Sequence, residues 1–266
     1  MRPIHAMSGL LFEVDSRDLL CYTEEKHDWE HRTNNMYLYE THMHTYPTSW
    51  CAECSPVQQV LAYKKRGYAG IIITDHFSRD ATVRLGGIAK QMEALTSGYR
   101  EARREGLRVG LDVFLGWEYG IAGSDLLTYG LTMEFLLKHP ELNVLNLEQY
   151  STLVRENGAY LAQAHPFRQS HWIANPYPLD PGCLDGIEAF NASIPDDVNQ
   201  KAFAFAKRHG LAVQAGSDSH RLDLPFVSGV ALSEKAERIE DIIEAIRTQR
   251  AGLILPKDWD DRSTEK

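Results

Sequence analysis

The sequence lacks the cysteine content of a disulfide scaffold. Its 266 residues hold four cysteines, Cys21, Cys51, Cys54 and Cys183, which are too few to crosslink a chain of this size. Cys51 and Cys54 form a CxxC motif, but a structural zinc site needs a second pair, and a thioredoxin-like motif opens a helix directly after a strand. We interpret the two cysteines as small residues at the start of a helix.

Long apolar runs are also missing. The chain is 43% hydrophobic and 24% charged, which is typical of globular domains, and no run reaches the length that crosses a bilayer. The N-terminal stretch MRPIHAMSGLLFEVDS has no charged region followed by an apolar run and a small-residue cleavage site. We therefore predict a cytoplasmic protein with no secretory signal and no membrane partner.

An excess of basic residues is absent too. Twenty-eight Lys and Arg stand against 37 Asp and Glu, which gives a net charge of −9. This balance argues against tight non-specific binding of nucleic acid, because such binding depends on basic surface and counterion release. A nucleotide or another small anion stays compatible with it, since bound metal ions can supply the local positive charge.

What the chain does have is a regular alternation of strand-like and helix-like segments from residue 36 onward. Helices are expected at 56–67, 90–106, 141–158, 196–210 and 234–250, and a loop at 77–87. Strands are expected at 37–45, 68–76, 107–120, 159–166, 184–193, 211–220, 227–233 and 251–256. This order predicts an α/β barrel over residues 36–266, with residues 1–35 as an extension packed on it.

Most of these strand-like segments end in a histidine or a carboxylate. In YLYETHMHT, His42 and His44 alternate, so both imidazoles leave the same face of a strand. The later segment ends add further donors: Asp75, His76, Glu118, His165, Asp218 and His220. Active sites of such barrels lie at the carboxyl ends of the strands, and a divalent ion needs four to six donors. The pattern predicts a metal site.

In this order and at these strand ends, the motifs His42-x-His44, Asp75-His76, Glu118, His165-Pro166 and Asp218-x-His220 resemble the PHP (polymerase and histidinol phosphatase) family over about residues 37–255. The resemblance implies a distorted (β/α)7 TIM-like barrel that hydrolyses phosphoesters with two or three divalent ions of Mn, Zn or Fe. It assigns His42, His44, Glu118 and Asp218 to one metal. Glu118 would bridge to a second metal that also binds His165, and His76 and His220 would hold a third.

Two positions depart from the family pattern. Members with three metals often have another histidine a few residues beyond the first pair, where this chain has Trp50 or Cys51. Another histidine usually follows the bridging glutamate, and Asp125 takes that position here. The cluster is therefore expected either to hold two metals or to use Asp125 as an oxygen ligand, which favours Mn or Fe over Zn.

The expected chemistry follows from these ligands. A water molecule that bridges two ions loses a proton and attacks phosphorus, and His76 or His220 protonates the leaving oxygen where it is not bound to metal. These two residues and Asp218 form the expected catalytic set. Arg168, followed by Arg79 and Arg84, are the candidates for binding phosphate. The expected partner is a small phosphomonoester or a nucleotide, such as histidinol phosphate, a nucleoside bisphosphate or the end of a short oligonucleotide.

Alternative interpretations stay open. A metal-dependent amidohydrolase also uses a barrel with an early His-x-His, but it more usually bridges its metals with a modified lysine, and no lysine ends a strand here. A non-catalytic module that binds metal or phosphate is the other alternative. Asp75 is expected to orient a histidine or accept backbone hydrogen bonds, and Asn191 to line the pocket or form a turn. Ordinary structural or surface roles are expected for His5, His27, His31, His139, His171 and His209.

Overall fold

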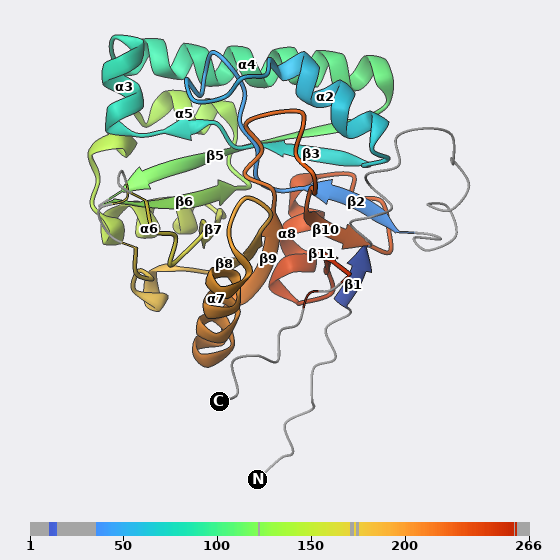
Figure 1. Cartoon of the computed structure of the whole chain (residues 1–266). Helices are drawn as coiled ribbons and strands as arrows, with labels where there is room; N and C mark the ends of the chain where they lie inside the picture. The colour runs from blue at the N-terminus through green and yellow to red at the C-terminus, as the bar shows by residue number, and fades with distance from the viewer. Residues whose placement is uncertain are drawn as a thin grey trace.

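The described part of the protein forms one mixed sheet that curves into a nearly closed barrel (Figure 1). The structure is a computed structural model that describes residues 11–14, 36–121, 123–170, 173, 176–257 and 259. The strands run across the sheet in the order β1 (Leu11–Val14), β11 (Gly252–Pro256), β10 (Gly229–Leu232), β2 (Tyr37–Glu40), β3 (Gly70–Ile73), β5 (Asp112–Ile121), β6 (Ser124–Tyr129), β7 (Tyr160–Gln163), β8 (Gly186–Asn191) and β9 (Ala212–Gly216). The short β4 (His76–Phe77) pairs with β5. The predicted distorted barrel is confirmed.

The distortion has a clear origin in the strand directions. The pairs β2–β3, β3–β5, β7–β8 and β8–β9 are parallel, whereas β6 is antiparallel to both of its neighbours, as is β10. Beyond β2 and β9 the chain is joined by a bridge between Met43 and Ser219, in which the His44 amide donates to the Ser219 carbonyl at 2.9 Å. This bridge holds the segment after β2 against the segment after β9, and both segments carry predicted metal ligands.

Helices cover the outside of the sheet. They are α2 (Pro56–Lys65), α3 (Arg79–Leu85), α4 (Ile88–Val109), α5 (Met133–Lys138), α6 (Leu147–Glu156), α7 (Asp196–His209) and α8 (Ile239–Arg247), with the 3₁₀ helices η1 (Pro140–Val144) and η2 (Pro181–Cys183). Helices α2 and α4 lie over β3 and β5, and α7 lies beside β8 on the other side (Figure 1). Within the described ranges, no helix combines the length and apolar character needed to cross a membrane.

The start of α2 follows its sequence signals. Ser55 accepts a hydrogen bond from the Gln58 amide, the Gln58 side chain returns one to the Ser55 amide, and Pro56 is the first helical residue. The predicted loop at 77–87 is wrong, because these residues contain α3. Ser78 caps that helix by accepting from the Ala81 amide at 3.2 Å, and Gly86 ends it in the left-handed conformation.

Three predicted helix boundaries are also wrong. Helix α4 ends at Val109, capped by the left-handed Gly110, and not at Gly106, because Gly106 is buried where a Cβ would lie 2.5 Å from the Leu111 carbonyl oxygen. Its missing side chain therefore serves close packing and not termination. The predicted helix at 141–158 is split into η1 and α6, since Leu145 is extended. The predicted helix at 234–250 begins only at Ile239, where the Asp241 carboxylate accepts from two preceding amides.

Alternation along β5 places Trp117 and Tyr119 on the face opposite to Glu118. Both aromatic side chains are buried in the outer core against Tyr150. The Tyr119 and Tyr150 rings stack with their centroids 3.8 Å apart. Trp117 Nε1 donates to the Tyr150 hydroxyl at 2.7 Å, and that hydroxyl also contacts Thr128 Oγ1 at 2.7 Å. This network fixes the face of β5 that leaves Glu118 pointing inward.

We expect Tyr150→Phe to lower the free energy of unfolding by ~1–3 kcal/mol, because the buried Trp117 N–H loses its acceptor while the ring packing stays. Urea unfolding followed by circular dichroism measures this change. Tyr46→Phe is the matched control, since the side chain of Tyr46 is half-exposed. Equal free energies of unfolding for the two variants would contradict the role assigned to the Tyr150 hydroxyl.

The N-terminal predictions largely fall on residues that lie outside the described ranges. Residues 1–10 and 15–35 of the extension lie outside, and with them His5, His27, His31 and Cys21. Residues 11–14 are described, and they form β1, which pairs in parallel with β11. The division of the chain into an extension and a barrel stays a prediction.

Candidate metal centre

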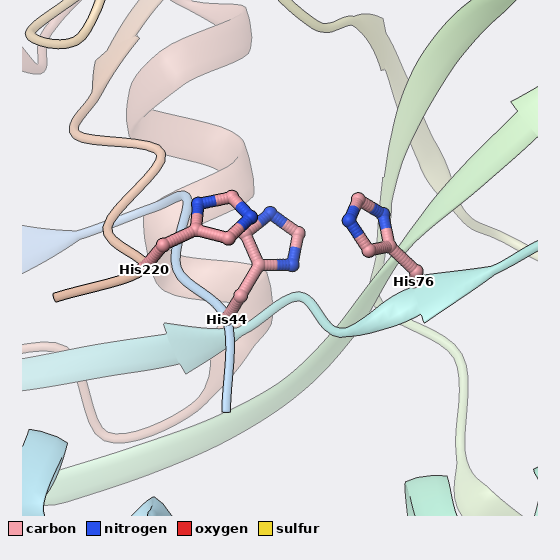
Figure 2. Close-up of side chains that lie close together, drawn as sticks. All are labelled: His44, His76 and His220. Atoms are coloured by element: carbon pink, nitrogen blue, oxygen red, sulfur yellow. The ribbon is translucent and has the colours of Figure 1, made fainter. Parts of the chain in front are cut away.

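The predicted ligands come together at one end of the barrel, although they are far apart in the sequence. His42 and His44 follow β2, His76 opens β4, Glu118 lies in β5, His165 follows β7, and Asp218 and His220 follow β9. Figure 2 shows the rings of His44, His76 and His220 close together on three separate segments. His42, His44, Glu118, His165 and Asp218 are buried. Metal binding by these side chains stays a prediction. The distances between their donor atoms decide whether they would fit one ion.

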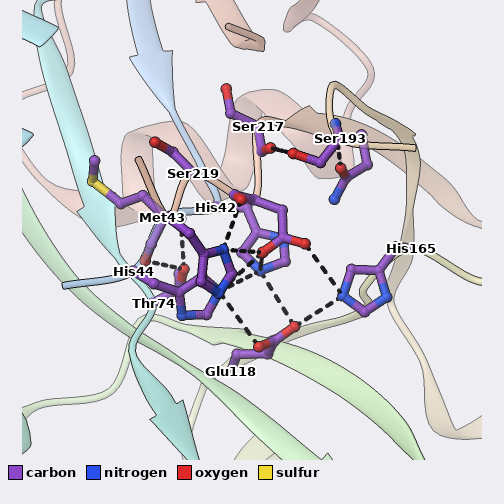
Figure 3. Close-up of polar contacts among 12 residues, drawn as sticks. His42, Met43, His44, Thr74, Glu118, His165, Ser193, Ser217 and Ser219 are labelled. Carbon is purple, nitrogen blue, oxygen red and sulfur yellow. Dashed lines mark hydrogen bonds and ion pairs between the residues drawn. The ribbon is translucent and has the colours of Figure 1, made fainter. Parts of the chain in front are cut away.

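The first donor set surrounds the space between His42 and His44. Their Nε2 atoms lie 3.2 Å apart, and each is within 3.5 Å of both a Glu118 oxygen and Asp218 Oδ1. Figure 3 shows Glu118 facing His42, His44 and His165 across this space. Donors placed ~2.1 Å from one tetrahedral ion are ~3.4 Å apart. The observed spacing of 3.1–3.5 Å therefore fits a single divalent ion.

A second donor set lies on the other side of Glu118. His165 Nε2 is 3.1 Å from Glu118 Oε1, and Asp125 completes a group whose potential ligand atoms all lie within 4.8 Å of one another. Burial and the nearby Glu118 charge raise the pKa of Asp125 to about 6. A cation bound between these carboxylates would relieve their repulsion, which is the behaviour expected of an oxygen-rich metal site.

The backbone is unusual at two of these positions. His165 has φ 30° and Asp218 has φ 51°, so both are non-glycine residues in the left-handed region. Such conformations cost free energy and are concentrated at functional sites, where the surrounding structure holds them. Here they aim the two side chains into the space shared with Glu118.

The charges of the cluster depend on one another. Burial raises the pKa of Glu118, but the neighbouring His42 and His76 outweigh burial and hold it well below its usual range. Burial lowers the pKa of His42, but Glu188, Asp218 and Glu118 hold it well above its usual range. Protons on the imidazoles thus neutralise the carboxylates in the arrangement described, a role that divalent ions would take over on binding.

Glu188 is a supporting residue that the sequence analysis missed. Its fully buried carboxylate contacts His42 Nδ1 at 2.8 Å and accepts from the His165 amide at 2.9 Å. Asn191 donates to the same carboxylate at 2.9 Å, so Asn191 lies behind Glu188 and does not line the pocket. A carboxylate on the far nitrogen of a histidine fixes the ring orientation of metal ligands. The available signal was a glutamate in the middle of an otherwise apolar strand, GIEAFN.

Asp75 and Ser49 support the opposite side of the cluster. Asp75 accepts from the Thr45 amide and hydroxyl and from Ser49 Oγ, at 2.6–2.7 Å. Ser49 Oγ in turn lies 3.2 Å from His44 Nδ1 and accepts from the His76 amide. The prediction that Asp75 accepts backbone hydrogen bonds is confirmed. It also orients His44, through Ser49.

We expect Glu188→Gln to lower metal affinity ~10–100-fold, as replacement of partners behind metal ligands commonly does. The amide can donate to His42 where the carboxylate only accepts, so the tautomer of the ring is no longer fixed. Competition with a fluorescent chelator measures the affinity. Glu148→Gln, on the outer helix α6, serves as the control. Unchanged affinity in a folded Glu188→Gln protein would show that Glu188 does not position the ligands.

Several side chains that were singled out lie away from the cluster. His139 pairs with Glu141 at 2.7 Å, and His209 is the last residue of α7, whereas His171 lies outside the described ranges. Cys54 is buried just before α2, as expected of a small residue at a helix start. Cys51 differs, because its sulfur contacts two imidazoles. Burial raises the pKa of the Cys51 thiol, but hydrogen bonds with His220 and His76 lower it to about 7.

A cleft of about 730 Å³ opens over the cluster and is lined by all three candidate arginines. Arg168 Nη1 lies 2.9 Å from Asp218 Oδ2, and Arg84 stacks over the exposed Trp50 ring at 4.0 Å. Arg79 is the first residue of α3. The cleft thus brings guanidinium groups to the same space as the buried ligands, which suits a small anion.

No protein-family model matches the sequence, and neither does any curated protein sequence. Solved structures do match. A two-domain protein from Bacteroides vulgatus, described as containing a predicted PHP-like metal-dependent phosphoesterase, gives a TM-score of 0.63 at 16% identity over 83% of this chain and 65% of that chain. An amidohydrolase from Chromobacterium violaceum gives 0.53 at 15% identity over 83% and 98% of the two chains.

A lesion-specific endonuclease from Pyrococcus furiosus matches with a TM-score of 0.52 at 14% identity, over 82% of this chain and 57% of that chain. This chain therefore spans less than two thirds of the length of the Bacteroides and Pyrococcus proteins. At such low identity, likeness of structure speaks for the fold alone. The chain shares its barrel fold with this group of hydrolases.

Proposed function

We propose that the protein is a metal-dependent phosphoesterase that hydrolyses a small phosphomonoester or a nucleotide. The observation that carries the proposal is the set of buried nitrogen and oxygen donors of His42, His44, Glu118 and Asp218, spaced as the ligands of one divalent ion. This set continues through Glu118 to His165 and Asp125. Two-metal hydrolysis needs two ions close together, and a carboxylate shared between neighbouring donor sets can hold them so.

The residues divide into three roles. Divalent ions in this site would polarise the ester oxygens and lower the pKa of a water molecule. Glu118 and Asp218 hold the donor sets in register, because each contacts histidines from different strands. Arg168 lies beside Asp218 at the edge of the cleft, where its guanidinium can bind the phosphate oxygens that face away from the donors.

The proteins with a similar barrel include one with a predicted phosphoesterase and a lesion-specific endonuclease, which act on phosphoesters, as well as an amidohydrolase. An amidohydrolase more usually bridges its metals with a modified lysine, and the described residues that line the cleft include no lysine. A cleft with three arginines over a histidine and carboxylate cluster favours a phosphoester over a neutral amide.

Phosphate release from a substrate panel tests the proposal. The panel contains histidinol phosphate, sugar phosphates, nucleoside mono- and bisphosphates and a short oligonucleotide, each with Mn²⁺ and with EDTA. Turnover of one member that requires metal and is lost in Asp218→Ala would support the proposal and name the substrate class. A folded protein that binds metal and hydrolyses none of the esters would overturn it.

We expect Arg168→Ala to raise KM for the preferred ester ~10–100-fold, because a hydrogen bond to a charged group is worth ~1.5–3 kcal/mol. Steady-state kinetics with bound metal measures KM and kcat separately. Arg155→Ala is the matched control, since Arg155 pairs with Asp185 on the outer surface and not in the cleft. If Arg168→Ala had the same KM as the control, Arg168 would not bind the phosphate, and Arg79 or Arg84 would be the next candidates.

A further inference from the structure

The sulfur of Cys51 lies between two imidazoles that come from different parts of the chain. Cys51 Sγ is 3.1 Å from His76 Nε2 and 3.2 Å from His220 Nε2. Cys51 lies in the loop after β2, His76 opens β4, and His220 follows β9. Figure 2 shows the two histidines on either side of His44. All three of Cys51, His76 and His220 line the cleft.

The other ring nitrogen of each histidine already has an acceptor. His76 Nδ1 is 2.7 Å from Glu118 Oε2, and His220 Nδ1 is 3.0 Å from the Asp218 carbonyl oxygen. Carboxylates and carbonyls accept hydrogen bonds, so these partners assign the ring hydrogens to Nδ1. In neutral rings, each Nε2 then presents a lone pair towards the Cys51 sulfur. A histidine that binds metal through one nitrogen and donates to an oxygen through the other has this same arrangement.

The two imidazoles and the sulfur thus bring three potential donor atoms together. Each Nε2 lies 3.1–3.2 Å from the sulfur, and without metal each contact needs a hydrogen on the nitrogen or on the sulfur. A cation that both nitrogens and the sulfur share takes the place of these hydrogens, because all three atoms then act as donors to it.

We infer that Cys51, His76 and His220 form a nitrogen–sulfur site for a soft divalent ion of the zinc type, with Cys51 bound as thiolate. Zinc is bound by sulfur at ~2.3 Å and by nitrogen at ~2.0–2.1 Å, which places neighbouring donors ~3.5 Å apart. The two distances from the sulfur to the nitrogens, 3.1 and 3.2 Å, need to lengthen by only a few tenths of an ångström to reach this spacing. Three protein ligands leave a fourth position open towards the cleft, as in zinc sites that bind substrate.

The inferred site differs in character from the oxygen-rich set on the other side of Glu118. Glu118, Asp125 and His165 offer mainly carboxylate oxygen, which suits Mn²⁺ or Fe²⁺, whereas a thiolate selects softer ions. The centre would therefore discriminate between metals at its two ends. The inferred site also assigns His76 and His220 to metal binding and not to protonation of the leaving oxygen.

Cobalt binding tests the inference directly. The full chain is freed of metal with a chelator, Co²⁺ is added, and the near-ultraviolet absorption is recorded. Coordination by thiolate gives a sulfur-to-cobalt charge-transfer band, which nitrogen and oxygen ligands do not give. We expect the band in the wild type and its loss in Cys51→Ala and Cys51→Ser. Zinc content, measured on the same proteins, is expected to fall by one ion per chain in Cys51→Ala.

Two further variants test whether the band comes from coordination by the Cys51 sulfur. Cys54→Ala is the matched control, because the Cys54 sulfur contacts only the His220 carbonyl oxygen at 3.5 Å among the contacts described; it should keep the band. Cys51→His supplies nitrogen in place of sulfur, so it should restore the zinc content without the band. Circular dichroism checks that each variant is folded.

The inference rests on the proposed metal dependence and not on the substrate. Wild-type protein that binds Co²⁺ without a sulfur band would overturn the inference and leave the proposed function intact. A band that persists in folded Cys51→Ala would overturn it as well. A wild-type chain that binds no divalent ion at all would overturn the inference and the proposed function together.

Discussion

Glu118→Gln is expected to abolish most metal-dependent hydrolysis, because this one side chain contacts two predicted metal-binding sets. Glu118 Oε1 lies 3.3 Å from His42 Nε2 and 3.1 Å from His165 Nε2, and Oε2 lies 2.7 Å from His76 Nδ1. An amide keeps the shape but removes the negative charge and turns one oxygen into a donor. Partners behind metal ligands typically contribute ~10–100-fold, so for a shared ligand we expect a loss of at least ~1000-fold in kcat/KM.

Kinetics on the preferred ester and metal analysis of the same preparation measure this effect. We expect the metal content to fall along with the rate, since the variant loses a donor common to two sets. Glu141→Gln is the matched control: Glu141 also contacts a histidine, His139, at 2.7 Å, but on the surface. If Glu118→Gln retained both metal and turnover at the level of Glu141→Gln, Glu118 could not be the shared ligand.

The second large effect concerns stability. Adding Zn²⁺ or Mn²⁺ to chelator-treated protein is expected to raise Tm, because an ion that binds only the folded state adds up to ~4 kcal/mol at a thousandfold excess over Kd. The rise in Tm should grow with pH. Metal ligands must lose their protons, so protons compete with the ion for the imidazoles. Differential scanning calorimetry, with EDTA and with metal over a pH series, measures both effects.

The stability of the metal-free protein is expected to fall as pH rises, opposite to the metal-induced gain. The folded state raises the pKa values of four histidines, His42, His76, His165 and His220, because neighbouring acidic groups and hydrogen-bond partners outweigh burial. The resulting stability is full below the unfolded pKa of histidine and is lost as pH rises through the raised values. His44, whose pKa is lowered by burial first, opposes them.

The carboxylates do not reverse this pH dependence of stability between mildly acidic and alkaline pH. Glu118 and Asp218 have lowered pKa values, so their stabilising contribution is lost only as pH falls through the acidic range. Between mildly acidic and alkaline pH, we therefore expect Tm to fall with pH in EDTA and the metal-induced gain to rise. A metal-induced gain in Tm that is the same at every pH would show that protons and metal do not share these imidazoles.

Local sequence signals were enough to locate the predicted ligands. His42 and His44 alternate at the end of a strand, and Glu118, His165 and Asp218 each terminate or follow an apolar strand-like segment. Strand ends at one side of a barrel converge whatever the detail of the helices. Errors in helix boundaries therefore did not affect the site: α3 was predicted as a loop, yet His76 just before it still faces Glu118.

The supporting residues could not be predicted in the same way. Glu40 ends β2 and Glu188 lies within β8; both carboxylates are fully buried, and nothing in their local sequence says what they contact. In the fold, Glu40 accepts from the His42 and Ser217 amides and thereby ties the end of β2 to the end of β9. A buried charge is tolerated only with such partners, and the partners come from strands that meet only after the sheet has curved.

The sequence by itself determined the α/β barrel, the side of the barrel that carries the site, and the residue types that favour a divalent ion, because strand alternation and strand ends are local properties. Only the tertiary structure decided how these donors are shared. The antiparallel β6, the Met43–Ser219 bridge and the left-handed conformations of His165 and Asp218 set their distances. The position of Cys51 between His76 and His220, 25 and 169 residues away, depends on closure of the sheet, which no local pattern encodes.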